Sequence, residues 1–256
     1  MRARARIRVE RRHGRDEVVD RSAEAPFAVR RCGDRIMLAA TAAAPVGGDE
    51  LDLDVVVGPG ATAAIGSIGA MLVWPSPNPT SSSMLTTITV GAGAHLTFAP
   101  EPTITVAGSH HRATTRVDLE PGATCELTEE FSLGRSGEPA GTVETSFRVT
   151  RAGAPLFHHD ETLGAAALSG ATSVGVGGAR HIATLVVVGP RVDRAATLVD
   201  GGGMAARLPL ADDAYAILAV GVDRPIVRAL IDRLRSTDEA ATRYGKTIRP
   251  IDAHPH

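Results

Sequence analysis

Hydrophobic and polar residues repeat in a fixed order through the first half of the chain. Three segments align on a Gly-Ala pair, at residues 60–61, 93–94 and 122–123. Apolar residues stand five and three positions before each glycine, and three and five positions after it. This spacing predicts a strand, a tight turn at the glycine and a second strand, each strand with one buried face. Glycine provides the positive φ that such a turn needs.

The repeat recurs about every 30 residues, so successive strand pairs can stack their apolar faces on one another. Further strands are predicted at residues 143–149, 182–188 and 215–222. Residues 2–9 alternate between arginine and apolar residues, which predicts a half-buried strand with an arginine face. We therefore expect a mainly β fold: layered antiparallel sheets, or β-helix-like stacked strand pairs, in one elongated body that forms a single domain over residues 1–256.

Helical spacing is confined to the region near the C-terminus. Asp223 is suited to be an N-cap and Pro225 to the first turn, and the apolar residues that follow recur at helical intervals. A second, shorter helix is predicted over residues 238–243, which gives about two helices in all. The tail at residues 247–256 is expected to be loosely ordered.

Composition narrows the class of protein. Of the 256 residues, 43% are hydrophobic and 22% charged, as in a globular protein, and only 3% are aromatic, so aliphatic side chains must build the core. A net charge of −2 argues against a nucleic-acid partner. The chain has no run of 18 apolar residues, so we expect no membrane span. Its two cysteines do not make a disulfide scaffold, which favours the reducing cytoplasm.

The sequence shows no assembled catalytic or metal motif. Ser67 follows Gly66 directly, so the Gly-x-Ser-x-Gly spacing of a nucleophile elbow is absent. The pairs His110-His111 and His158-His159 lack metal-ligand spacing, and neighbouring residues on a strand point to opposite faces. We interpret these histidines as exposed polar residues in turns. We therefore assign no catalytic residue and no firm metal ligand.

Acidic residues gather at two places. In residues 49–54, Glu50, Asp52 and Asp54 alternate with apolar residues, which is the pattern of a solvated strand face. A second cluster lies in residues 129–138. A glycoside hydrolase needs two carboxylates at a defined separation, but one Trp and two Tyr offer few platforms for sugars.

Several blocks in order resemble the urease accessory protein D family, called UreD or UreH. They are Val46-Gly-Gly-Asp49 with Gly58-Pro-Gly-Ala61, Phe98-Ala-Pro-Glu-Pro-Thr-Ile, Leu133-Gly-Arg-Ser-Gly-Glu138, and Arg151-Ala-Gly-Ala-Pro-Leu156. The resemblance implies a scaffold with many strands that has no catalytic activity. It also implies binding to apo-urease subunits and to accessory proteins F and G, the latter a GTPase, and delivery of nickel to the urease active site.

In such a protein the resemblance implies an internal, water-filled passage for the ion. Clusters of Cys or His would trap Ni²⁺, whereas scattered carboxylates and hydroxyls bind weakly enough to release it. We therefore expect transient Ni²⁺ rather than a tightly bound cofactor. The candidate passage residues are Asp49, Asp52, Asp54, Glu101, Glu129 and Glu138.

Two other functions stay open from the residues alone. One is a glycan-acting enzyme of β-helix type that uses the acidic strand face. The other is a structural β module that binds protein and transfers no ion.

Overall fold

The computed structural model describes residues 1–78, 80–164, 178–189 and 196–244. The predicted loose tail at residues 247–256 lies outside the described residues. The assignment of the whole chain to one domain stays a prediction.

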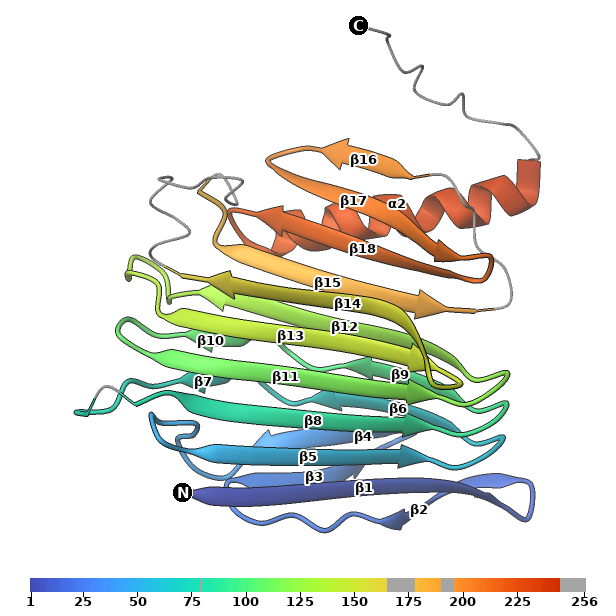
Figure 1. The fold of residues 1–256 in the computed structure, drawn as a ribbon, viewed down its shortest axis with the longest axis horizontal. Helices are drawn as coiled ribbons and strands as arrows, with labels where there is room; N and C mark the ends of the chain where they lie inside the picture. The colour runs from blue at the N-terminus through green and yellow to red at the C-terminus, as the bar shows by residue number, and fades with distance from the viewer. Residues whose placement is uncertain (79, 165–177, 190–195, 245–256) are drawn as a thin grey trace, which may run out of the picture.

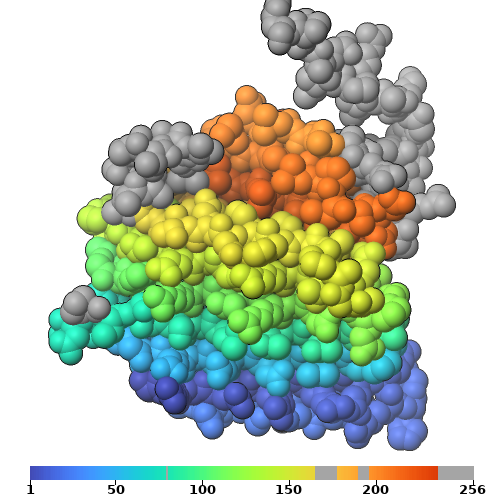
Figure 2. Space-filling model, viewed as in Figure 1, coloured from blue at the N-terminus to red at the C-terminus, as the bar shows by residue number. Residues whose placement is uncertain are grey.

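Two β-sheets face each other along the body, and in its middle the strands of each sheet follow one another in chain order (Figure 1). The first sheet, sheet A, has seven strands in the order β14 (Ala154–Leu163), β13 (Thr142–Arg151), β11 (His110–Leu119), β8 (Ser82–Val90), β5 (Glu50–Val57), β1 (Arg2–Arg12) and β2 (Arg15–Asp20). The second, sheet B, has eleven strands, nine of them in the order β16 (Thr197–Asp200), β17 (Gly203–Ala211), β18 (Ala214–Gly221), β15 (His181–Val188), β12 (Thr124–Leu133), β9 (His95–Ala99), β6 (Thr62–Ser67), β4 (Arg35–Ala40) and β3 (Phe27–Cys32). The short strands β10 (Thr103–Thr105) and β7 (Met71–Val73) extend sheet B beside β12. In the space-filling view the colours form successive bands, so each segment lies on the one before it (Figure 2).

The three Gly-Ala segments form the predicted strand pairs. The first strand of each pair lies in sheet A and the second in sheet B, and the glycine between them has a φ of 66°, 64° or 74° at Gly60, Gly93 and Gly122. The turns also bond to one another, because the N–H of Gly60 donates to the carbonyl of Ala92 at 2.9 Å. The repeat is therefore a stack of coils, and each coil crosses from sheet A to sheet B at its Gly-Ala turn.

The mainly β, stacked-pair architecture is confirmed, but the direction of pairing differs from expectation. β5, β8, β11 and β13 run parallel in sheet A, as do β4, β6, β9 and β12 in sheet B. Each coil returns to the same sheet after a full circuit, so equivalent strands must point the same way. Antiparallel pairs occur toward the C-terminal end of the stack, in the hairpin of β13 and β14 and in the neighbours β12, β15 and β18.

The core follows the alternation that the sequence predicts. Ile7, Val55 and Ile65 are fully buried between the sheets, and the strands predicted at residues 143–149, 182–188 and 215–222 lie within β13, β15 and β18, the last of which ends one residue earlier than predicted. The pattern therefore identified the inward faces correctly.

A single helix, α2 (Arg224–Tyr244), is present in the described part of the chain. The carboxylate of Asp223 accepts a hydrogen bond from the N–H of Ile226 at 3.0 Å, which confirms the predicted N-cap. The predicted second helix is wrong, because residues 238–243 continue α2. Val227, Leu230 and Ile231 pack against the outer face of β15, β17 and β18. No helix among the described residues combines the length and the apolar character needed to cross a membrane.

Candidate functional site

A cavity of about 560 Å³ lies between the two sheets. Its walls are mostly apolar and include Leu53, Ile88, Leu127 and Phe147. At its rim Ile68 is 62% exposed, so the cavity opens to solvent there. A buried space of this size with a few polar groups is the kind of site that binds or conducts a small ligand.

The cavity passes through sheet B at a break in strand pairing. β9 pairs with β12 as far as Leu127, and β10 pairs with β12 only from Phe131 onward. Glu129 and Glu130 lie in this interval, where β12 has no partner on the β9/β10 edge but pairs with β15 on its other edge, and both line the cavity. Neighbouring side chains on a strand point to opposite faces, so the Glu129 side chain faces sheet A and the Glu130 side chain faces α2. The cavity therefore reaches the break in sheet B at a point where one carboxyl group lies on each side of the sheet.

Glu129 is the carboxyl group on the inner side of this opening. It accepts hydrogen bonds from the hydroxyls of Thr115 at 3.1 Å and Thr145 at 2.7 Å, which come from β11 and β13 of sheet A. Burial raises the pKa of Glu129, and the two hydroxyls offset only part of that effect. A cation that binds here must displace a proton when the carboxyl group is neutral.

Glu130 is the carboxylate on the outer side, and its side chain is only 4% exposed. It accepts from Nε of Arg224 at 2.8 Å, from Nε2 of His181 at 3.2 Å and from Nη2 of Arg228 at 3.3 Å. Burial by itself would raise the pKa of Glu130, but the His181 hydrogen bond and the two arginine charges outweigh it, so the pKa lies below its ordinary value. Glu130 is therefore an ionised, fully paired group.

Glu101 connects this group to the mouth of the cavity. Its N–H donates to the hydroxyl of Ser67 at 2.8 Å, and its carboxylate forms a short ion pair with Nη1 of Arg224. Arg224, in the first turn of α2, thus bridges two glutamates that both line the cavity. We call these two ion pairs the Arg224 bridge.

His111 adds an unexpected polar group to the cavity wall. The ring is fully buried, Nδ1 lies 2.8 Å from the hydroxyl of Ser82, and Nε2 has no partner among the described residues. Burial lowers the pKa of His111 to about 4, so the ring is neutral at pH 7. The interpretation of the histidine pairs as turn residues is wrong, because both pairs lie on strands, and of the expected exposed rings His111 is instead buried.

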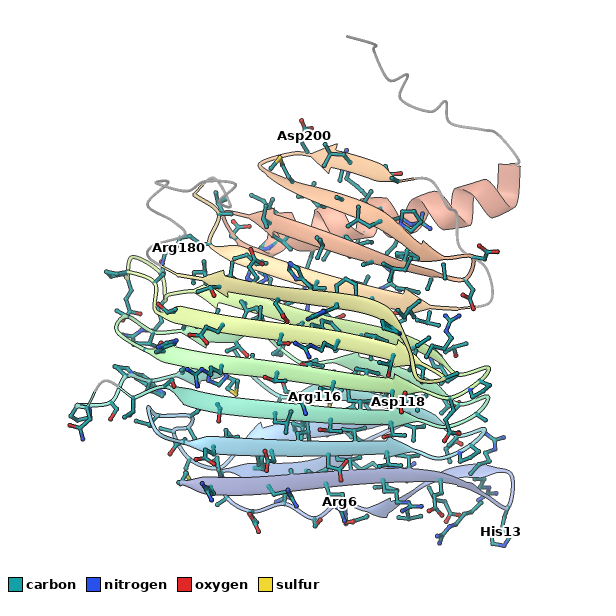
Figure 3. All side chains as sticks on the ribbon, viewed as in Figure 1. Arg6, His13, Arg116, Asp118, Arg180 and Asp200 are labelled. Carbon is teal, nitrogen blue, oxygen red and sulfur yellow. The ribbon has the colours of Figure 1, made fainter. Side chains whose placement is uncertain are left out.

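Four of the six predicted passage residues lie away from the cavity. Asp52 and Asp54 are on the outer face of β5, where they pair with Arg4 and Arg6 of β1. Figure 3 labels Arg6 on this outward face of sheet A. Such exposed pairs contribute little to stability, and the structure gives them no route to the interior.

The other two are held by local contacts. Asp49 accepts from the N–H of Val46 at 2.8 Å and pairs with the amino group of Met1 at 2.6 Å. Nε of Arg135 donates a hydrogen bond to the carboxylate of Glu138 at 2.8 Å, and this hydrogen bond lowers the pKa of Glu138 to about 2. Only Glu101 and Glu129 are brought to one cavity, and a passage role for any of the six stays a prediction.

Sequence reasoning missed the outer half of the site. Glu130 was seen only as part of an acidic cluster, and its partners His181 and Arg224 are 51 and 94 positions away. One signal was available: a cation in the first turn of a helix opposes the helix dipole, so Arg224 implied a specific anionic partner. Among the described residues no three His, Cys, Asp or Glu side chains are placed to hold a metal ion. The site can therefore offer oxygen ligands to a passing cation but no closed ligand set.

Comparison with known proteins agrees with the resemblance. The family described as "UreD urease accessory protein" matches residues 1–251. A protein of Parafrankia sp. named "Urease accessory protein UreD" is 32% identical, over 91% of this chain and 88% of its own length. "Urease accessory protein UreD 3" of Streptomyces griseus is 35% identical, over 91% of this chain and 95% of its own length. The chain belongs to the UreD urease accessory protein family, and it is an accessory protein rather than an enzyme.

Proposed function

We propose that this protein binds apo-urease together with accessory proteins F and G, and that nickel reaches the urease active site through its cavity. Membership of the UreD family supports a role in urease maturation. The observation that supports the finer proposal is the break in sheet B, where Glu101, Glu130 and Glu129 line one continuous space. Nickel is the cargo here, and no tight nickel site is proposed.

The chemistry of the lining suits a conduit. Carboxylate and hydroxyl oxygens of Glu101, Glu129 and Thr115 bind a divalent cation more weakly than a cluster of thiolates or imidazoles would. Conduction needs sites that are strong enough to admit an ion and weak enough to release it. Glu129 adds a condition, because burial raises its pKa and any proton that it carries competes with an entering ion.

A cytoplasmic location is part of the proposal. Cys32 is exposed and Cys125 is buried, and neither forms a disulfide. Free thiols in a chain of this size are typical of a reducing compartment.

Co-expression with urease and the other accessory proteins tests the passage. Glu129→Gln keeps the size of the side chain but removes its ability to become a carboxylate ligand. We expect the variant to co-purify with apo-urease as well as the wild type does, while the nickel content of the urease falls several-fold. Asp52→Asn is the matched control, because it removes an acidic group of the same predicted set that lies outside the cavity, and it should leave the nickel content unchanged.

Two results would change the conclusion. If urease co-purifies but Glu129→Gln leaves its nickel content unchanged, the cavity is not the route and the protein-binding β module without ion transfer is favoured. If no urease subunit co-purifies with the wild type, the partner assignment is wrong. The glycan-acting enzyme is excluded by membership of an accessory-protein family.

A further inference from the structure

We infer that the Arg224 bridge is a gate on the cavity: it closes the opening in sheet B, and withdrawal of Arg224 by movement of the start of α2 opens it to a divalent cation. This inference rests on the proposed passage and concerns its regulation. It follows from where Arg224 lies, what it neutralises and what holds it in place.

Arg224 contacts two carboxylates that come from different segments beside the break in sheet B. Glu101 precedes β10 and Glu130 lies on β12, so the two carboxylates come from segments on either side of the break in sheet B. Both line the cavity, whereas Arg224 belongs to the helix outside and reaches each of them with a different nitrogen. One guanidinium group therefore joins the two sides of the break from outside the cavity.

The positive charge of Arg224 neutralises carboxylates at the break in sheet B. Around the opening stand Glu101 and Glu130, the cations Arg224 and Arg228, and the imidazole of His181. With the bridge formed, both carboxylates are paired with guanidinium groups, so an approaching Ni²⁺ meets no net negative charge. Without Arg224, two carboxylates remain with one arginine, Arg228, whose side chain is 53% exposed and can turn into solvent. The same oxygens then become ligands for a hard or borderline cation.

The start of α2 holds Arg224 in place. It is in the first turn of α2, next to the N-cap Asp223, so any displacement of the helix start carries the guanidinium group with it. The closed state also leaves one hydrogen-bond donor without an acceptor, because Nη2 of Arg224 is buried without a partner among the described residues. A partner protein that docks on the exposed side of α2, which carries Arg228, Asp232 and Arg233, is placed to shift this equilibrium.

Nickel binding by the purified full-length chain tests the gate without urease. The probe is Ni²⁺ alone in equilibrium dialysis near pH 7.5, with Arg224→Met, which keeps an unbranched chain but removes the charge. We expect Arg224→Met to bind Ni²⁺ at least tenfold more tightly than the wild type. Adding Glu101→Gln to that variant should return the affinity to the wild-type level, since one of the freed carboxylates is gone.

Arg235→Met is the matched control. Arg235 also comes from α2 and pairs with a glutamate of β12, Glu126 at 2.9 Å, but Glu126 does not line the cavity. Its loss should leave Ni²⁺ affinity at the wild-type level. All variants keep the nine histidines of the chain, so background binding by imidazoles is common to them. An equal gain for Arg224→Met and Arg235→Met, or no gain for Arg224→Met, overturns the gate.

A conservative variant keeps the test decisive if Arg224→Met does not fold, as judged by circular dichroism. Lys at this position keeps one charge but cannot contact both carboxylates through a planar fork, so Arg224→Lys should give a smaller gain, about threefold. No gain in Arg224→Lys then refutes the gate. Urease loading by the cavity variants tests the passage and Ni²⁺ affinity of the isolated chain tests the gate, so the two failures are distinguishable.

Discussion

Glu130 offers the sharpest test of how the site is held together. The variant Glu130→Gln keeps the shape of the side chain but removes a buried charge that accepts from His181, Arg224 and Arg228. Hydrogen bonds to charged groups contribute about 1.5–3 kcal/mol each, but not all three are lost in full. Arg228 is half exposed and contributes little, Arg224 keeps its pairing with Glu101, and the amide can still accept one bond.

The expected cost is therefore about 2 kcal/mol of unfolding free energy. In a chain of this length that corresponds to a fall in Tm of about 4–8 °C. Thermal unfolding followed by circular dichroism measures it directly. Glu126→Gln is the control, since Glu126 lies on the same face of β12 and also pairs with an arginine of α2, but both side chains are more than a third exposed. That variant should lose less than about 1 kcal/mol.

The effect of Glu130→Gln must also depend on pH in one direction. The pKa of Glu130 lies below its ordinary value of 4.5, so the stabilisation from its charge is complete above that value and is lost as the pH falls through the lowered pKa. The Tm difference between wild type and variant should therefore be constant from pH 6 to 8 and shrink in acid. Equal losses for Glu130→Gln and Glu126→Gln, or a difference that grows in acid, would refute the reasoning.

The stack, the cavity and the N-cap of α2 each give one further prediction. In urea unfolding, Gly91→Ala should cost about 3 kcal/mol of unfolding free energy, because its Cβ would lie 2.7 Å from the backbone nitrogen of Pro59. Gly60→Ala meets open space and should cost only about 1 kcal/mol, for its positive φ. Similar costs for the two variants would contradict this reasoning. Glu129→Gln should gain stability relative to wild type as the pH rises from 5 to 8, because a carboxyl group with a raised pKa destabilises the fold once the pH exceeds its ordinary value. If the Tm of the variant and the Tm of the wild type instead keep a constant difference over this pH range, the carboxyl group is not desolvated. Asp223→Ala should lower Tm by about 2–4 °C through loss of the N-cap, and an unchanged Tm would mean the cap contributes nothing.

Much of the scaffold could be predicted from spacing alone. The apolar positions around Gly60, Gly93 and Gly122 fixed which residues face inward and where the chain turns, because alternation and positive φ are local properties. The N-cap at Asp223 was predictable for the same reason. Strand direction was not, since parallel coils and antiparallel hairpins bury the same alternating residues, and only the connection between coils distinguishes them.

The site depended on contacts that a sequence does not display. Glu129 and Glu130 are neighbours in the chain, yet one binds threonines of sheet A and the other binds α2. Nothing in the residues marks the interval where β9 has ended and β10 has not begun, although Pro100 and Pro102 within it cannot donate to a strand ladder. Asp52 and Asp54 show the same limit from the other direction, because their place in the matched blocks does not reveal that both pair with arginines of β1 on the outer face of sheet A.

The coil register has a consequence for how the chain is made. Glu50 pairs with Ser83 and Ser82 with His111, so the strands of successive repeat coils find their neighbours about 30 residues away in the chain. A nascent polypeptide leaving the ribosome can then add one coil at a time to those already formed, without waiting for its C-terminus. At every stage the newest strand presents an open edge, which makes translation pauses near a coil boundary the moments when association between unfinished chains is most probable.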